Sequence, residues 1–267
     1  MQPGFLFLPL PSPEIDKSLR CMYDIPMHRS IETIGKTFLN LLYPLRCASC
    51  GKDLEALDEL HVCGRCLKSI RPNPAPHCVV CGRSLYNARE ICADCRKDRP
   101  VFERAYSACV YEGALKEMIH AFKFKRRIAL SGILSDIMVD FARDNSEVAD
   151  GVEIITFVPL HASRLREREF NQSEALARGF GLASGVPCVD ALRKARKTAP
   201  QNELSKDERT LNLAGAFKVK DAAAVNGKTV LLIDDVMTTG STLNECAKAL
   251  LGAGAKAVRC CTLARGT

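Results

Sequence analysis

The chain has 267 residues, of which 47% are apolar and 26% charged, a balance typical of globular proteins that excludes a collagen, a coiled coil or a disordered chain. Its 38 Lys and Arg against 31 Asp and Glu give a net charge of +7, which is compatible with a nucleic-acid or phosphate partner without requiring one. No stretch approaches the roughly 18 uncharged apolar residues of a membrane-spanning helix, so we expect no membrane span.

Residues 1–43 form the first predicted unit, an N-terminal leader with a short amphipathic helix. Residues 5–10 are apolar but short and interrupted by proline, with no positive charge before them, so they make a poor signal peptide. Residues 1–27 fit a disordered leader or a start codon assigned too early. From Ile31 to Leu42 apolar side chains recur at helical spacing, and Pro44 ends the pattern. Without export, we expect a cytoplasmic protein with reduced thiols.

Residues 44–100 form the second predicted unit and hold eight of the 14 cysteines, in four CxxC pairs. Each half has one pair followed by glycine and then, after a polar stretch, a second pair, so the two halves are an internal repeat. The turn directs two thiolates at one ion, and the glycine supplies the positive φ that tightens it. Two pairs make a closed four-sulfur zinc site of the structural kind. The predicted ligands of two zinc ions are Cys47, Cys50, Cys63, Cys66, Cys78, Cys81, Cys92 and Cys95.

The pairing of these ligands stays open from sequence alone. The simplest scheme joins the first four cysteines in one site and the last four in another, and a cross-braced scheme is the alternative. Iron–sulfur clusters and redox disulfides compete with zinc. His61 and His77 lie beside ligands, but eight thiols suffice, so we expect ordinary surface histidines. The proline-rich linker 71–76 is expected to be stiff and to hold the two ribbons apart.

Residues 101–267 form the third predicted unit, in which strand and helix patterns alternate. The patterns predict strands over residues 153–158, 216–219, 228–233 and 257–263. They predict helices over residues 113–125, 129–143, 171–184 and 241–251. Such alternation is typical of an α/β domain with a parallel sheet and crossover helices.

The most specific signal lies in residues 229–242. A buried strand delivers Asp234 and Asp235 to its carboxyl end, where ligands of open α/β sheets bind. A small hydroxyl-rich loop follows and a helix begins, an arrangement whose backbone N–H groups hold phosphate. The predicted phosphate-loop residues are Met237, Thr238, Thr239, Gly240, Ser241 and Thr242.

The two acids suit diol hydroxyls and a Mg²⁺ ion, so the segment predicts a site for a 5-phosphorylated ribose. A strand–turn–helix without a ligand is the alternative, but it leaves two adjacent acids at a buried strand end. A Walker-type ATP site is excluded because no GxxxxGK motif occurs.

Three basic groups are further candidates, and a solvated charged face is the alternative for each. Arg164 and Arg168 follow the strand ending at Val158, at an edge of the sheet where ligands bind. The polar stretch 193–212 begins with Arg193, Lys194, Arg196 and Lys197 and could form a mobile lid. The third group interleaves with Phe122 and Phe124, which suits single-stranded nucleic acid and equally suits a helix with a core face and a basic face. Its members are Lys123, Lys125, Arg126 and Arg127.

Residues 229–242 resemble the phosphoribosyl pyrophosphate (PRPP) signature of type I phosphoribosyltransferases. Together with the cysteine-rich module they resemble the ComF family, the competence-associated ComFC/GntX-like proteins. This resemblance covers the chain from about residue 38. Further family-like stretches are residues 111–116, 123–125, 158–160, 164–168, 170–172, 198–201 and 209–212, and Phe217. The resemblance implies a type I phosphoribosyltransferase-like parallel sheet with flanking helices, preceded by a double zinc ribbon.

One position departs from the family pattern. Glu169 stands where the family usually has glycine. If that position needs a positive φ, glutamate costs about 1 kcal/mol there. It also places an acid among arginines meant for phosphate.

The resemblance also implies a function: binding of PRPP with Mg²⁺, and a part in DNA uptake or use of external DNA. In a transferase of this fold, Arg164 and Arg168 would face the pyrophosphate. Single-stranded DNA would be the cargo and a DNA-uptake helicase the partner. The alternative is an active phosphoribosyltransferase of nucleotide metabolism with an unidentified acceptor, since turnover stays open. A purely structural zinc adaptor leaves the phosphate loop unexplained.

Overall fold

The computed structural model describes residues 45–54, 61–86, 90–198 and 211–266. The predicted leader and helix over 1–43 lie outside these residues, as do residues 199–210 of the predicted lid. Arg46–Thr267 form one compact unit, so the cysteine-rich segment and the α/β domain are described together. No helix in the described part of the chain is long and apolar enough to cross a membrane.

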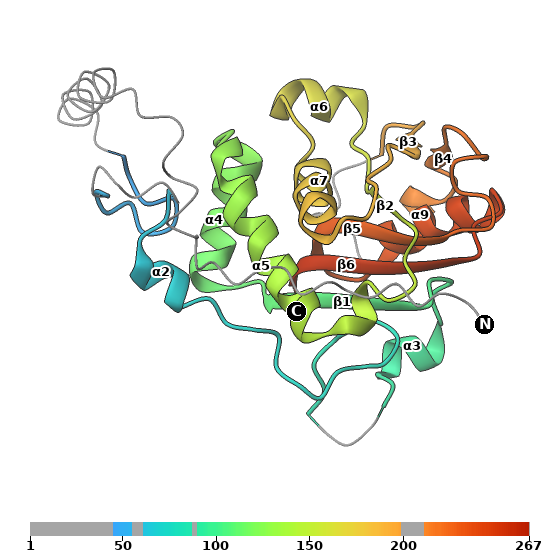
Figure 1. Ribbon diagram of the computed structural model, residues 1–267, viewed down its shortest axis with the longest axis horizontal. Coiled ribbons are helices and arrows are strands. Elements are labelled where there is room, and N and C mark those ends of the chain that lie inside the picture. The colour runs from blue at the N-terminus through green and yellow to red at the C-terminus, as the bar shows by residue number, and fades with distance from the viewer. Residues whose placement is uncertain (1–44, 55–60, 87–89, 199–210, 267) are drawn as a thin grey trace, which may run out of the picture. The chain divides into compact units, whose positions relative to one another are not determined.

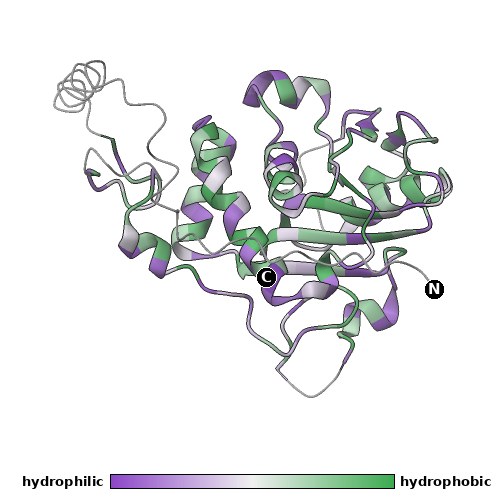
Figure 2. Ribbon diagram, in the orientation of Figure 1, coloured by the Kyte–Doolittle hydropathy of each residue, from purple (hydrophilic) through white to green (hydrophobic). Residues whose placement is uncertain are grey.

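A four-stranded parallel sheet is the centre of this unit (Figure 1), in the order β1-β6-β5-β2. Its strands are β1 (Arg104–Val110), β2 (Ile154–Phe157), β5 (Thr229–Met237) and β6 (Ala257–Arg265). Both central strands are almost fully buried, as parallel strands covered on two faces should be. Their apolar character is visible along the sheet in Figure 2.

Helices cover both faces of the sheet. Leu231 and Ile233 belong to one core cluster with α4 (Gly113–Phe124), α5 (Ser131–Asp144) and α7 (Gln172–Ser184). The alternate residues Val230 and Leu232 belong to a second cluster with α9 (Ser241–Gly252). Because successive strand residues point to opposite faces, the two clusters are the two sides of one sheet.

Smaller elements complete the α/β domain. Strands β3 (Leu192–Lys194) and β4 (Phe217–Val219) form a separate antiparallel pair. Helix α6 (Ala162–Arg168) follows β2, and single 3-10 turns span Ile128–Leu130 and Ser146–Val148.

The two cysteine-rich ribbons join different sides of the sheet. Short helices α2 (Gly64–Lys68) and α3 (Ala93–Lys97) begin at the second CxxC pair of each ribbon. Cys47 and Cys66 pack in the cluster of α4 and α5, whereas Cys78 and Cys81 pack in the cluster of α9. The linker between the ribbons runs along the outer edge of β1. The N–H group of Val110 donates to the carbonyl oxygen of Arg71 at 3.0 Å, and the N–H group of Asn73 donates to that of Ala108 at 3.0 Å. The linker thereby covers the edge of the sheet.

The predicted α/β class is confirmed, and each strand and helix predicted for residues 101–267 is present with shifted ends. The largest shift is in β5, which was expected to end at Ile233 but continues to Met237. It continues because it stays paired with β6 as far as Arg265. The sequence patterns did not predict β1, β3 or α6.

Candidate functional site

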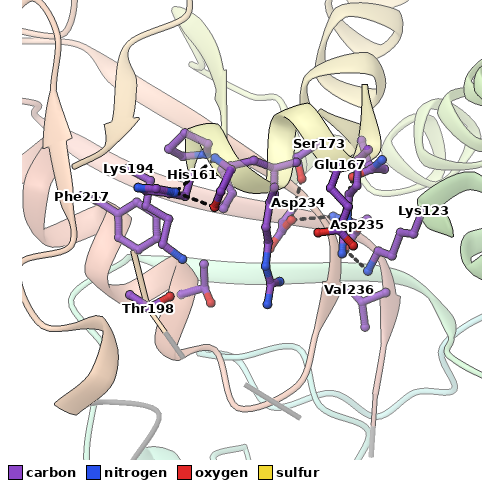
Figure 3. A pocket seen from close by; sticks show the side chains of 18 of the residues that line it. Lys123, His161, Glu167, Ser173, Lys194, Thr198, Phe217, Asp234, Asp235 and Val236 are labelled. Atoms are coloured by element: carbon purple, nitrogen blue, oxygen red, sulfur yellow. Dashed lines mark hydrogen bonds and ion pairs between the residues drawn. The ribbon is translucent and has the colours of Figure 1, made fainter. Parts of the chain in front are cut away.

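A cavity of about 690 Å³ lies at the carboxyl ends of β2 and β5, within the size range of small-molecule sites. The residues after β2, the first turn of α7 and the last turn of α4 form its walls together with β3 and β4 (Figure 3). This edge of the sheet is where the sequence predicted ligand binding.

The predicted acid pair lines the cavity, and each acid has a partner from a flanking helix. Ser173 Oγ, in the first turn of α7, donates to Asp234 Oδ1 at 2.7 Å. Lys123 Nζ, in the last turn of α4, lies 2.8 Å from Asp235 Oδ1. Burial and the charge of Asp235 raise the pKa of Asp234 to about 7, against the lowering effect of Ser173 and Lys123. The acid pair therefore lines the cavity with Ser173 and Lys123 as its partners.

The structure divides the basic group at the end of α4. Lys123 lines the cavity, and its side chain is 18% exposed. Lys125 and Arg126 are exposed, and Arg127 Nη1 donates to the carbonyl of Arg46 in the first ribbon at 2.8 Å. Only the last three lie on the outer surface that the nucleic-acid prediction needs.

The two aromatic residues of that segment also separate. Phe122 is fully buried, whereas Phe124 is 54% exposed and lines the cavity. The segment thus has both a core face, at Phe122, and an exposed basic–aromatic face, at Phe124. Each of the two sequence interpretations is correct for one of these faces.

Cations outnumber acids in the cavity. Its five Lys and Arg residues are Lys123, Arg164, Arg168, Lys194 and Lys197, and its three acids are Glu167, Asp234 and Asp235, an excess of 5 − 3 = 2. The predicted pyrophosphate residues Arg164 and Arg168 are therefore both present. Burial, reinforced by Arg164, lowers the pKa of Lys194 to about 8. An excess of cations favours an anionic ligand.

The predicted phosphate loop has two sides. Thr238 and Thr242 line the large cavity, beside the acid pair. Met237, Thr239, Gly240 and Ser241 line a smaller recess toward the second ribbon. Gly240 has a φ of 84° and is the N-cap of α9, a conformation that glycine adopts without strain.

The two cysteine tetrads fit zinc. In each, the four Sγ atoms lie within 4.8 Å of one another, and the structure selects the sequential pairing over the cross-braced one. Cys50 Sγ and Cys63 Sγ are 3.8 Å apart, and Cys81 Sγ and Cys92 Sγ 3.7 Å. A tetrahedral ion with Zn–S bonds of about 2.3 Å has sulfur separations of about 3.8 Å. These groups are therefore structural zinc sites.

Backbone groups support the thiolates as the turn chemistry predicts. Cys63 N–H donates to Cys47 Sγ at 3.4 Å, and Cys92 N–H to Cys78 Sγ at 3.3 Å. Burial raises the pKa of the Cys47 thiol, but the backbone donors outweigh it and the pKa falls to about 6. Gly51 and Gly82 take the expected positive φ angles of 71° and 67°. His61 and His77 belong to neither tetrad.

Known proteins share both halves of this architecture. Residues 38–103 match the double zinc ribbon domain, and residues 171–267 match the phosphoribosyl transferase domain. The DNA utilization protein YhgH of Escherichia coli (strain K12) is 32% identical over 231 residues, which cover 84% of this chain and 99% of that protein. The chain belongs to the ComF family.

Two further relatives of this ComF protein are matched over most of their length. Competence protein F of Haemophilus influenzae is 29% identical over 84% of this chain and 98% of that protein. Competence protein ComFC of Bacillus subtilis is 30% identical over 72% of this chain and 79% of that protein. Among solved structures, the adenine phosphoribosyltransferase of Leishmania tarentolae has a TM-score of 0.33 and 16% identity, over 54% of this chain and 74% of that chain.

The Phe-Asn-Gln segment of this ComF protein fixes the start of α7 beside the cavity. Asn171 Oδ1 accepts from Ser173 N–H at 3.1 Å, and its Nδ2 donates to the carbonyl of Val158 at 3.0 Å. Asn171 thus ties Ser173, and through it Asp234, to the end of β2. Ser173 was not among the predicted site residues, although its place two residues after a helix-capping Asn was a usable signal.

Glu169, the departure from the ComF pattern, has a φ of 69°. The backbone at this position is therefore left-handed, a conformation that glycine adopts with less strain than glutamate. Its carboxylate forms an ion pair with Arg126, whose own φ is 54°. Both side chains are more than half exposed, so the pair lies at the surface, beside Arg168.

Proposed function

We propose that this ComF-family protein binds PRPP or a related phosphoribosyl ligand in the large cavity, as part of the use of external DNA. One observation carries the proposal: an acid pair and a hydroxyl-rich helix N-terminus share one cavity that has an excess of cations. In this assignment Thr238 and Thr242 receive the 5-phosphate, Asp234 and Asp235 the ribose hydroxyls, and Arg164 and Arg168 the pyrophosphate.

Magnesium enters this proposal with the pyrophosphate. The carboxylates of Asp234 and Asp235 are ligands of the kind that Mg²⁺ prefers. Lys123, however, already neutralises Asp235 at 2.8 Å. We therefore assign the ribose hydroxyls to the acid pair, and we propose that Mg²⁺ is bound by the pyrophosphate oxygens.

The DNA part of the proposal rests on the relatives and on one surface. The Escherichia coli relative is named a DNA utilization protein and two others are named competence proteins. Lys125, Arg126 and the exposed ring of Phe124 are the side chains we assign to single-stranded DNA, with a DNA-uptake helicase as protein partner. Zinc ribbons with reduced thiols suit a reducing compartment, so we propose a cytoplasmic location.

The ligand proposal is tested by titration calorimetry with PRPP and Mg²⁺. Asp234→Asn is the decisive variant, because it keeps the shape of the side chain and leaves the Lys123–Asp235 ion pair in place. We expect PRPP affinity to fall at least about tenfold, since hydrogen bonds to a charged acceptor contribute about 1.5–3 kcal/mol. Asp190→Asn is the control, because Asp190 forms an exposed ion pair with Lys220.

An unchanged affinity in Asp234→Asn, or no PRPP binding by the native chain, would contradict the assignment. Pyrophosphate release with nucleobases, measured on the same samples, separates binding from turnover. Release with one base would favour the transferase of nucleotide metabolism over the binding protein proposed here.

A further inference from the structure

Arg265, the last residue of β6, is a buried cation without a carboxylate partner. It is 5% exposed. Its Nη1 donates to the carbonyl oxygen of Cys81 at 3.3 Å, and its Nη2 lies 3.8 Å from Cys81 Sγ. Within the described ranges no carboxylate is at ion-pair distance from this guanidinium, and its Nε has no hydrogen-bond partner. A buried charge of this kind needs a counter-charge.

The second tetrad supplies that counter-charge. Four thiolates and one Zn²⁺ carry −4 + 2 = −2, and all four cysteines of this tetrad are buried, whereas Cys50 of the first tetrad is exposed. The neighbouring Arg83 already pairs with Asp94 at 2.9 Å. Arg265 is thus the cation placed to balance a buried zinc–thiolate group, in the manner of the outer partners that orient and tune metal sites.

The same arginine is directly connected to the phosphate loop. It is the register partner of Met237 on β5, and the N–H of the next residue, Gly266, donates to Met237 O at 2.9 Å. The methyl group of Met237 packs on Gly240, where an added Cβ would lie 2.6 Å from it. A shift of Arg265 therefore displaces Met237 and the turn at Gly240.

A second set of contacts joins this ribbon to the loop. The small recess is lined by Cys81 and Cys95 of the ribbon and by Arg265 of β6. Its loop residues are Met237, Thr239, Gly240 and Ser241. Just after the ribbon, Val101 N–H donates to Asn244 Oδ1 in the first turn of α9 at 2.8 Å. The first tetrad lies in the core cluster of α4 and α5, on the other side of the sheet.

We propose that Arg265 is a positioning residue that couples the metal of the second tetrad to the phosphate loop. The bound metal holds the thiolate cluster that balances Arg265, and Arg265 in turn holds Met237 and Gly240 in the ligand-binding arrangement. Loss of this metal loosens the loop, whereas loss of the metal from the first tetrad does not. The consequence for ligand affinity rests on the proposed function, but the coupling itself does not.

The coupling is tested on the full chain by hydrogen exchange of peptides that contain residues 237–242. We expect Arg265→Gln to raise exchange in these peptides at least about tenfold, as expected for loss of a buried charge partner. Arg259→Gln is the matched control, because Arg259 is on the same strand and bonds Glu103 at 2.9 Å. It should leave these peptides unchanged.

Zinc release to a chromogenic chelator gives a readout that is independent of the loop. Two sites predict two phases, and Arg265→Gln should accelerate one of them by about 10–100-fold, the usual cost of removing an outer partner of a metal site. Arg265→Lys keeps the charge but loses the fork geometry, so it should release zinc at an intermediate rate. This variant keeps the test decisive if the Gln variant does not fold.

Cysteine variants separate the two tetrads. Cys95→Ser should raise loop exchange and weaken PRPP binding, whereas Cys50→Ser should lower the zinc content and leave the loop unchanged. The inference is overturned if Arg265→Gln changes neither loop exchange nor zinc release, or if Cys50→Ser loosens the loop as much as Cys95→Ser. Failure of the native chain to bind PRPP overturns the proposed function alone, since exchange and zinc release still report the coupling.

Discussion

Glu169 is an acid next to the cavity residue Arg168, in a backbone conformation that disfavours glutamate. The position has a φ of 69°, and the carboxylate is paired with Arg126. We expect Glu169→Gly to raise PRPP affinity a few-fold, because an acid beside Arg168 opposes an anionic ligand. Stability should change little, since relief of the left-handed strain offsets the added freedom of glycine in the unfolded chain. Calorimetry and thermal unfolding measure the two effects.

Glu169→Ala is the matched control for this prediction. It removes the same charge but keeps the left-handed conformation, so it should raise affinity similarly and lower stability by about 1 kcal/mol relative to Glu169→Gly. If both variants weaken binding, the Arg126 ion pair holds α6 in place and the charge argument is wrong.

For single residues, the sequence predicted which residue types line the site better than it predicted their hydrogen-bond and ion-pair partners. The acid pair, the hydroxyl-rich loop and the two arginines were all visible as a pattern. The acids, the arginines and two threonines of the loop line the cavity. The partners of the acids were not visible, because Ser173 and Lys123 come from distant helices whose packing no local pattern encodes. Lys123 was grouped with its basic neighbours because a run of charges does not show which one turns inward.

The two ribbons have the same local turn in different surroundings. Gly51 and Gly82 each follow a CxxC pair with nearly equal φ angles, 71° and 67°. A Cβ at Gly51 would meet nothing within 4 Å, whereas at Gly82 it would lie 2.5 Å from the carbonyl oxygen of Ala105. The glycine is required by the turn in both ribbons and by packing against β1 only in the second.

Alanine substitution at these glycines separates the two requirements. We expect Gly51→Ala to cost about 1–2 kcal/mol, the cost of a left-handed L-residue. Gly82→Ala should cost roughly 1–3 kcal/mol more, as overpacked sites do, because the Ala105 carbonyl belongs to a strand and cannot turn aside. Denaturant unfolding with zinc present measures both. Equal losses of stability would show that the second ribbon can move away from β1.

Helices, strands and ribbons were predicted where the sequence pattern lies within a short stretch of chain. They were missed where their formation depends on distant segments. The CxxC repeats fixed the ribbons because the chemistry of one zinc site lies within about 20 residues. Strand β5 was expected to end at Ile233, because acids rarely continue a buried strand, yet its pairing with β6 carries Asp234 and Asp235 inside it. Strand β1 contains small and polar residues whose burial depends on β6 and on the linker beside it, so periodicity alone could not reveal it.

In the whole molecule the ribbons have different neighbours, and this affects which surfaces are available to partners. The first ribbon packs with α4 and receives the Arg127 hydrogen bond, so its surface adjoins Lys125 and Arg126. The second ribbon packs against the phosphate loop. Two zinc ions on eight thiolates change the formal charge by −8 + 4, so the +7 of the sequence becomes about +3. The remaining positive charge is small, so nucleic-acid binding depends on where it is concentrated.

That dependence gives the last prediction, for single-stranded DNA. We expect weak, sequence-indifferent binding that falls with salt, because single strands lose affinity with a slope of about −0.7 per phosphate contact. Lys125→Glu should flatten the slope by about one contact, since Lys125 is exposed at the end of α4 beside the exposed ring of Phe124. Lys256→Glu makes the same change of charge at an exposed site between α9 and β6 and should leave the slope unchanged. Fluorescence anisotropy at several salt concentrations measures the slopes. An equal effect of both variants would mean that net charge alone attracts DNA. An absence of DNA binding at low salt would remove DNA from the proposed function and leave the proposed ligand site in the cavity unaffected.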